Sequence, residues 1–301
     1  MSKVKIAGHA SGSGTLTIQA PDTSSSRTIT LPDATGTLSV GSSIDDNGNA
    51  TAITIDSSEN VGIGVVPESW DSDYKALQIS NWSALYGKNT SKNTFLTTNV
   101  YRDSGGYKYL GTDVATNYSQ ASDGAHKFYV AASGSADATI SWTTAMTINN
   151  DGIITKPAQP AFQLIQTSVI SNVTGDGTTY KFVGTEAFDQ NADCTTTTFT
   201  APVTGRYHFD VSVCFVSLSS ATDVFVDLIT PNQDYRWNPA GNNPTVTGNT
   251  SYPVITGSIL ADMDASDTAY LNIFVNGVGA DSVDIYSADA STTFFSGYLV
   301  A

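Results

Sequence analysis

Apolar residues alternate with other residue types from Tyr207 to Phe215, where every odd-numbered position is apolar. Side chains with a period of two lie on opposite faces of a β-strand, so this stretch predicts a strand with one face in a core. The other hydrophobic stretches are short and rich in Val, Ile, Thr, Tyr and Phe, which suit a pleated sheet. Because charged residues are also few, the composition predicts an all-β protein.

The charge of the chain restricts its partners. The formal net charge is −15 with only 13 Lys and Arg, whereas nucleic acids and anionic membranes are bound through clustered basic side chains. We therefore expect no nucleic acid and no membrane insertion. No stretch approaches the roughly 20 apolar residues of a membrane span, and no signal-peptide-like run opens the sequence, which predicts synthesis in a cytoplasm.

Residues 1–50 contain three short apolar alternations, at 16–18, 28–31 and 37–40, separated by Pro-Asp and Gly turns. Short strands of this kind are marginal in water unless they pack against copies of themselves or against another protein. We therefore predict that residues 1–50 form a docking or intertwined β segment.

An internal repeat brackets the next part of the chain, because the pattern of residues 51–64 is echoed at 144–154. Two copies are too few for a solenoid, so we interpret them as strand-and-turn brackets around a central β fibre domain, 51–155. We interpret its aromatic residues as core and trimer interface, although exposed sugar-stacking aromatics would have the same pattern. They are Trp70, Tyr74, Trp82, Tyr86, Phe95, Tyr101, Tyr107, Tyr109, Tyr118, Phe128, Tyr129 and Trp142.

Pro157 and Pro160 predict a linker at 156–160, because prolines this close deny both helix and central-strand pairing. Residues 161–301 follow as a last domain, in which many short strands with turns between them suggest a β-sandwich. The predicted strands are 162–170, 180–183, 196–200, 206–216, 224–230, 270–275 and 292–300.

Two segments of this last domain resemble a known family. They are 199–209, Phe-Thr-Ala-Pro-Val-Thr-Gly-Arg-Tyr-His-Phe, preceded by Phe188-Asp189, and the closing 293–300, Thr-Phe-Phe-Ser-Gly-Tyr-Leu-Val. Both resemble the globular head of complement component q and the related tumour-necrosis-factor-like jelly rolls. The resemblance covers about 160–301 and implies a ten-stranded jelly roll of two sheets that forms a compact trimer.

The first half is similar to bacteriophage fibre proteins, especially those of marine and cyanobacterial phages. The resemblance rests on 15–21 and 28–38, and on the phrase 56–64 followed by 74–79. The usual form of that phrase has Gly where this chain has Glu59, which predicts a slightly different turn. The resemblance implies a structural module and names no receptor.

Few residues are candidates for catalysis. His9, His126 and His208 lie in three different modules without a nucleophile or ligand motif beside them, and we interpret His208 as a surface or interface residue. Cys194 and Cys214 are interpreted as free thiols, with a disulfide as the alternative, because a cytoplasmic origin disfavours disulfides. We therefore assign no catalytic, cofactor-binding or metal-binding residue and expect neither an enzyme nor a cofactor.

Two acidic loops, 45–49 and 262–267, place several oxygen atoms close together, as calcium prefers. Neither has the complete twelve-residue calcium pattern with its terminal Glu. Because turns use the same residue types, solvated turns are the favoured interpretation and calcium sites are the alternative.

These observations predict an elongated homotrimeric fibre of a bacteriophage virion, namely a tail fibre. Residues 1–50 would bind a tail, neck or capsid protein, and the C-terminal head would bind a host glycan or protein receptor. Loops 217–223, 231–257 and 276–291 are the predicted contact surface, because loops carry recognition. One alternative is a decoration or cement fibre on the capsid or neck. Another is a polysaccharide-degrading tailspike, for which 65–145 is short and lacks repeated rungs.

Overall fold

The computed structural model describes residues 43–45, 51–216, 218, 220–240, 252–287, 289 and 292–301. These residues form strands joined by turns and bends, and the all-β prediction is confirmed. Within this part of the chain, no helix has the length and apolarity that a membrane crossing requires. Most of the predicted docking segment 1–50, with the acidic loop beyond Asp45, lies outside the described residues.

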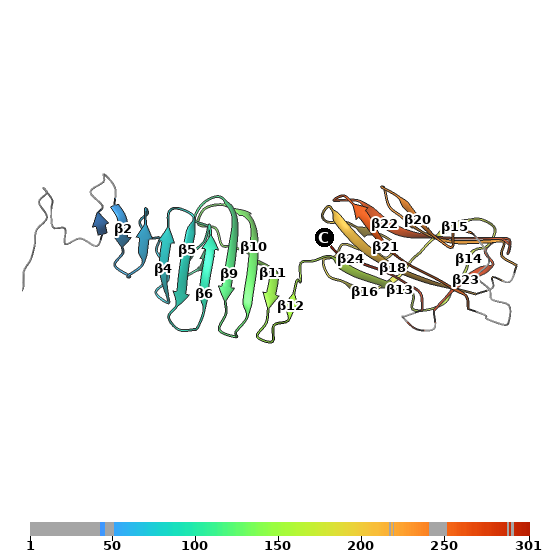
Figure 1. The fold of residues 1–301 in the computed structure, drawn as a ribbon, viewed down its shortest axis with the longest axis horizontal. Coiled ribbons are helices and arrows are strands. Elements are labelled where there is room, and N and C mark those ends of the chain that lie inside the picture. The colour runs from blue at the N-terminus through green and yellow to red at the C-terminus, as the bar shows by residue number, and fades with distance from the viewer. Residues whose placement is uncertain are drawn as a thin grey trace, which may run out of the picture. The chain divides into compact units, whose positions relative to one another are not determined.

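The first half folds into one ten-stranded sheet, the central sheet, in the order β1-β2-β3-β4-β5-β6-β9-β10-β11-β12 (Figure 1). Neighbouring strands are antiparallel except for the parallel pair β3 and β4. The strands are β1 (Ser43–Asp45), β2 (Thr51–Ile55), β3 (Val61–Ile63), β4 (Tyr74–Ile79), β5 (Ser83–Lys88), β6 (Thr94–Thr98), β9 (Asp113–Gln120), β10 (His126–Gly134), β11 (Thr143–Ile148) and β12 (Ile154–Thr155).

One face of the central sheet is covered by segments of the same chain. The rings of Tyr86 and Phe95 stack there at 4.8 Å. A hairpin of β7 (Tyr101–Asp103) and β8 (Gly106–Lys108) lies against them, with Tyr107 at 6.4 Å from Phe95. Half of the aromatic residues expected in a core are buried on this face, whereas Trp82 is half exposed. The buried ones are Trp70, Tyr74, Tyr86, Phe95, Tyr101 and Tyr109.

The two copies of the internal repeat form the same hairpin turn. In the first copy Asp56 N donates to Asn60 O and Glu59 N donates to Asp56 O, both at 3.0 Å. In the second copy Asn149 and Gly152 make the corresponding bonds at the same distances. Glu59 therefore stands where the second copy has Gly152, and both have a left-handed φ, 65° and 81°. The turn keeps its shape despite Glu59, so the expected difference in the turn is not seen.

Glu59 gives a matched pair of stability tests. A residue with a side chain loses about 1–2 kcal/mol of folding free energy in the left-handed region. Glycine avoids this strain but loses more conformational entropy on folding, which offsets part of the gain. Glu59→Gly is expected to stabilise the protein by roughly 0.5–1 kcal/mol and Gly152→Glu to destabilise it by a similar amount. Urea unfolding followed by tryptophan fluorescence measures both. Glu59→Ala is the control, because it removes the exposed ion pair with Lys75 but keeps a side chain. If Glu59→Gly stabilises the protein no more than Glu59→Ala does, the backbone explanation is wrong.

The second half folds into two packed sheets of the head, 161–301. The first head sheet has the strand order β14-β23-β18-β24-β13-β16, and β21 also pairs with β18 (Figure 1). The second head sheet has the order β15-β22-β19-β20, and β17 also pairs with β22. The chain passes between the sheets at β18–β19, β20–β21, β21–β22 and β22–β23, which is a jelly roll. The strands are β13 (Ala161–Ile165), β14 (Ile170–Thr174), β15 (Thr179–Lys181), β16 (Thr185–Asp189), β17 (Phe199–Thr200), β18 (Gly205–Val216), β19 (Asp223–Ile229), β20 (Asp234–Trp237), β21 (Val254–Met263), β22 (Thr268–Asn276), β23 (Val283–Tyr286) and β24 (Phe294–Leu299).

The two sequence segments that resemble the jelly-roll family meet in the core of the head. Gly297 on β24 lies opposite Phe209 on β18 and Phe162 on β13. A Cβ atom at Gly297 would lie 2.6 Å from Cδ1 of Phe209 and 2.9 Å from Cε1 of Phe162. Phe209 is fully buried and Phe162 almost so, and their rings fill the space that a side chain at Gly297 would need.

Gly297→Ala is expected to destabilise the head by about 1–3 kcal/mol, because the two phenylalanine rings must move to admit the methyl group. Ser296→Ala is the control, since Ser296 lies next to it on the opposite face of the same strand. Differential scanning calorimetry should show a lower midpoint for Gly297→Ala alone. Equal midpoints for the two variants would show that the packing around Gly297 is not tight.

The structure corrects several predicted boundaries. The predicted strand 162–170 is interrupted, because β13 ends at Ile165 and β14 begins at Ile170. The predicted loop 231–257 contains β20 and the start of β21, and the predicted loop 276–291 contains β23. These strands were missed because they are short or contain turn-forming residues. Gly257, for example, lies within β21 because the Trp237 indole occupies the space beside it. The described residues of the head form twelve strands, where the resemblance implied ten.

Cys194 and Cys214 are both free thiols, as the sequence favoured. Burial raises the pKa of Cys214 to about 11. Burial and the neighbouring carboxylates of Asp189, Glu186 and Asp193 raise the pKa of Cys194 to about 12. Both thiols are therefore protonated near neutral pH and poorly reactive.

Candidate functional site

The second face of the central sheet is apolar and is not covered by the described chain. Leu85 on β5 lies opposite Leu77 on β4 and Leu96 on β6, and the row continues across the next strands to Met146. Leu85 is 44% exposed and Leu96 is 55% exposed. We call this surface the central apolar face, and its row consists of Leu77, Leu85, Leu96, Tyr118, Phe128 and Met146.

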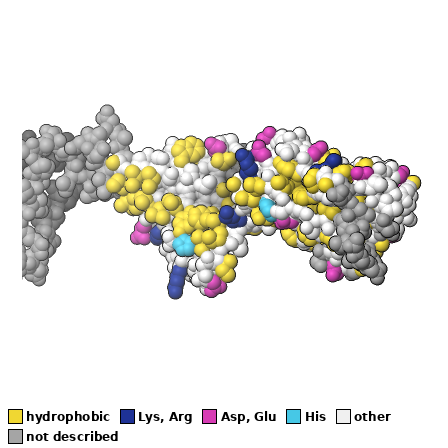
Figure 2. Space-filling model, turned by 45° about the vertical axis from the view of Figure 1, so that its right-hand side comes forward, with side chains coloured by type: hydrophobic (Ala, Val, Ile, Leu, Met, Phe, Trp, Pro, Cys, Tyr) yellow, Lys and Arg dark blue, Asp and Glu magenta, His cyan; other side chains and the backbone are white. Residues whose placement is uncertain are grey.

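More apolar side chains extend the central apolar face at both ends of the row. Ile63 pairs with Ile79 near one end, and Ile148 pairs with Ile154 at the other. Hydrophobic side chains gather in broad patches on the surface of this part of the chain (Figure 2). Ten strands spaced about 4.8 Å apart and roughly 18 Å long give a sheet face of about 800 Å², which the apolar row shares with polar side chains such as Ser83, Thr94 and Gln120. That area is about what one partner contributes to a stable protein interface.

The central apolar face carries little charge. From β2 to β12, no described strand position on this side is Asp or Glu, although the whole chain has a net charge of −15. Lys75 lies at its margin and pairs with Glu59 at 3.3 Å. His126 stacks on Tyr118 with ring centroids 6.0 Å apart, and its Nδ1 shares a hydrogen bond with the Tyr118 hydroxyl at 2.6 Å. Acidic copies of this chain could therefore meet here without bringing carboxylates together.

The first head sheet also has an uncovered face, which we call the head face. His208 on β18 lies between Leu260 on β21 and Tyr298 on β24. Leu260 and Tyr298 are each about half exposed, and the rings of His208 and Tyr298 are 5.2 Å apart. His208 Nε2 is 2.8 Å from Ser258 Oγ, and its Nδ1 is 3.3 Å from an Asp210 oxygen. The expectation that His208 is a surface or interface residue fits this position.

A shallow hollow of about 670 Å³ lies beside His208 on the head face. Polar side chains from four strands line most of it, with Phe294 as its one aromatic ring. They include Gln163, Asp210, Ser212, Thr256, Ser258 and Ser296. The head face is therefore more polar than the central apolar face.

The predicted acidic loop 262–267 is held together by its own contacts. Asp262 pairs with Arg206, and one Asp267 oxygen accepts hydrogen bonds from Asp264 N at 2.9 Å and Asn232 Nδ2 at 3.3 Å. In the described part of the chain, no three His, Cys, Asp or Glu residues are placed to hold a metal ion. The other acidic loop, 45–49, lies outside the described residues beyond Asp45, as does His9.

Comparison with known proteins finds similarity among solved structures. No family model matches the sequence, and no curated protein sequence matches it. The globular domain of the zebrafish complement 1qA protein is 16% identical, with 48% of this chain and 98% of that chain covered and a TM-score of 0.33. Murine APRIL is 11% identical, with 47% of this chain and 99% of that chain covered and a TM-score of 0.33. At these identities the likeness concerns the fold alone.

The sequence reasoning missed the central apolar face, although a signal for it was present. One face of β4 carries the apolar Tyr74 and Ala76 with Gln78, and the other carries the apolar Leu77 and Ile79 with Lys75, so both faces are mainly apolar. A strand with one solvated face is expected to show polar residues at alternate positions, and β4 does not. Such a pattern indicates a sheet that is covered on both sides.

Proposed function

We propose that this chain is a structural subunit of a bacteriophage virion fibre, most specifically a tail fibre, that works as a homotrimer without catalysis. The head contacts the host surface, and residues 1–50 attach the fibre to the virion. The observation that carries the proposal is the central apolar face, which is large, nearly uncharged and uncovered within one chain.

The need for partners follows from the free energy of apolar exposure. Apolar surface buried from water contributes about 25 cal/mol per Å², so burying the exposed apolar side chains of this face favours association. Patches beyond a few hundred Å² are rare on monomeric proteins. Further copies of the same chain supply matching apolar faces that also lack carboxylates. An assembly of three chains is supported by the resemblance of the head sequence to trimer-forming jelly rolls.

The virion assignment is supported by the first half of the sequence. Residues 56–64, which are similar to phage fibre proteins, form the hairpin turn between β2 and β3 near one end of the central sheet. The second copy of the repeat forms the same turn between β11 and β12 at the other end. A host-binding role for the head is supported by its jelly-roll loops, because rigid sheets present loops for recognition.

The oligomeric state is the first test. The wild-type chain is expected to scatter light at micromolar concentration as a particle of about 95 kDa, three chains of 31.6 kDa. Leu96→Glu combined with Leu260→Glu is expected to give a folded monomer, because each glutamate would bring unpaired charges together at an interface. Val66→Glu is the control, since Val66 is 70% exposed in the connection between β3 and β4.

Leu96→Glu alone is expected to raise the concentration at which the trimer dissociates by at least about tenfold. A wild-type monomer at micromolar concentration would overturn the homotrimer. A double variant that stays trimeric would show that these two faces are not the interface, while circular dichroism confirms that each variant is folded.

The position on the particle is the second test. Antibody-labelled protein is expected at the tail of intact virions in electron micrographs, and purified trimer is expected to bind host cells and compete with phage adsorption. Antibody label on the capsid or neck would contradict the tail fibre assignment and indicate a decoration or cement fibre instead. Release of sugar fragments from host envelopes would instead indicate a tailspike.

A further inference from the structure

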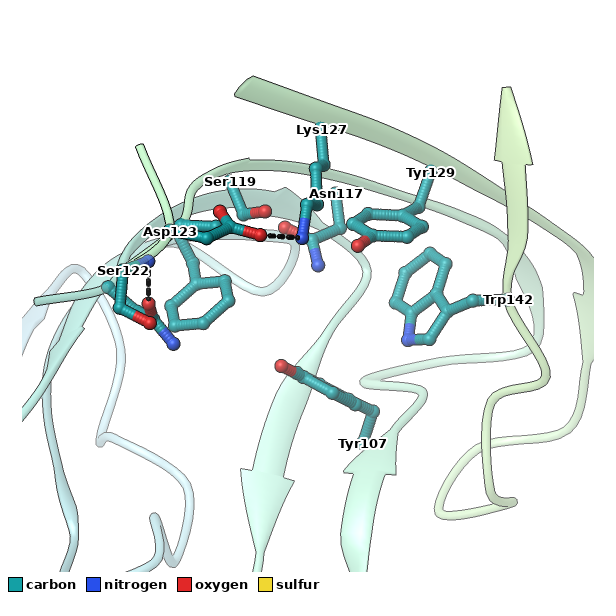
Figure 3. A pocket seen from close by; sticks show the side chains of 11 residues that line it. Tyr107, Asn117, Ser119, Ser122, Asp123, Lys127, Tyr129 and Trp142 are labelled. Atoms are coloured by element: carbon teal, nitrogen blue, oxygen red, sulfur yellow. Dashed lines mark hydrogen bonds and ion pairs between the residues drawn. The ribbon is translucent and has the colours of Figure 1, made fainter. Parts of the chain in front are cut away.

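The covered face of the central sheet contains a pocket of about 330 Å³ (Figure 3). Its base is formed by Phe95 on β6, Asn117 and Ser119 on β9, and Lys127 and Tyr129 on β10. Tyr107 and Trp142 form its walls, and the turn between β9 and β10 forms its rim. The remaining lining residues are Asn93, Ala121, Ser122 and Asp123. A volume near 300 Å³ is at the small end of ligand sites.

Aromatic rings frame this pocket on more than one side. Trp142 lies 5.9 Å from Tyr107 in an edge-to-face arrangement and 6.1 Å from Tyr129. Figure 3 shows Tyr107 across the pocket from Tyr129 and Lys127. Tyr107, Tyr129 and Trp142 are all only partly buried, so their rings are accessible to a ligand. Rings of this kind offer an apolar surface to the C–H face of a sugar and a polar edge to its hydroxyl groups.

Two polar atoms of the pocket are buried without a hydrogen-bond partner, namely Asn117 Oδ1 and Trp142 Nε1. Asn117 is only 4% exposed. Buried polar atoms are almost always hydrogen-bonded, and leaving one unpaired is unfavourable. One atom is an acceptor and the other a donor, so hydroxyl groups, which both donate and accept, would satisfy both.

The charges at the rim are balanced. Lys127 Nζ lies 2.8 Å from Asp123 Oδ2, and Asp123 Oδ1 accepts a hydrogen bond from Ala125 N. Ser122 N donates to Asn93 Oδ1 at 2.6 Å, which fixes the same turn. Because the ammonium and carboxylate groups neutralise each other, an ionic ligand would find no unpaired charge here. The pocket therefore favours an uncharged ligand.

We propose that this pocket binds an uncharged pyranose, either a free sugar or one residue of a glycan. The aromatic rings take its C–H face, and Asn117 Oδ1 and Trp142 Nε1 pair with its hydroxyl groups. The site is formed by a single chain and lies on the face opposite Tyr118 and the central apolar face, so it does not depend on the proposed assembly. It adds a sugar contact in the central sheet to the host contact proposed for the head.

The test is titration of the full chain with methyl glycosides of glucose, galactose, mannose and N-acetylglucosamine, followed by calorimetry and tryptophan fluorescence. At least one is expected to bind with a dissociation constant of roughly 1 mM. N-acetylneuraminic acid and glucosamine, which are charged, are expected to bind at least about tenfold more weakly, because neither finds an unpaired partner charge.

Trp142→Phe and Asn117→Leu are expected to weaken the sugar affinity by about tenfold each, since each removes one hydrogen-bonding atom. Asn117→Leu should not lower the unfolding temperature of the sugar-free protein, because the Oδ1 atom that it removes is unpaired there and leucine has a similar shape. Trp142→Phe is expected to lower it, because the smaller ring loses packing against Tyr107 and Tyr129. This combination distinguishes a ligand-binding atom from a structural one. Trp82→Phe is the matched control, because Trp82 does not line the pocket, and it should leave the affinity unchanged.

Three results would overturn the proposal. One is the absence of binding by every uncharged sugar up to about 50 mM, well above the expected dissociation constant. Another is equal binding of wild type and both pocket variants. The third is a clear destabilisation of the sugar-free protein by Asn117→Leu, which would show that the Asn117 side chain is already paired. None of these results bears on the homotrimer, which the light-scattering experiment tests separately.

Discussion

A sheet one layer thick has two faces, and a chain of limited length can cover only one of them with its own loops. The central sheet covers one face with the β7–β8 hairpin and the aromatic cluster around Tyr86, and it leaves the row from Leu77 to Met146 uncovered. The cost of exposing these apolar side chains to water favours a partner on the second face. The proposed assembly follows from this geometry more than from any single residue.

The head solves the same problem within one chain. Its two sheets face each other, and buried residues from both of them meet in one core. The glycine in the closing sequence segment is required because Phe162 and Phe209 occupy its side-chain space. The resemblance to jelly rolls thus has a physical basis in close packing between β13, β18 and β24. The outer face of this sheet is more polar than the central apolar face, with His208, Asp210 and Ser258 beside Leu260 and Tyr298.

The sequence predicts the fold class well and the surfaces poorly. Strict alternation at Tyr207–Phe215 predicts β18, and the signature segments predict the jelly roll, because a period of two and a tightly packed glycine are local signals. β20 and β21 escape prediction because Trp237 and Gly257 depend on each other across distant parts of the chain. The pocket could not be predicted, since Tyr107 and Trp142 reach it from a hairpin and a connection that no local pattern places together.

A single irregularity connects the central apolar face with the pocket. Phe128 on β10 pairs with Met146 on β11, but its neighbour Tyr129 pairs with Thr144, so Ala145 is an extra residue in β11. Met146 and Ile148 therefore lie with Phe128 on the central apolar face, whereas Thr144 lies on the side of Tyr129. With regular pairing the even positions of this stretch would all lie on one face, and Trp142 would be on the wrong one. The bulge at Ala145 places Trp142, which directly precedes β11, on the pocket side, so one extra residue puts neighbouring side chains on the central apolar face and in the pocket.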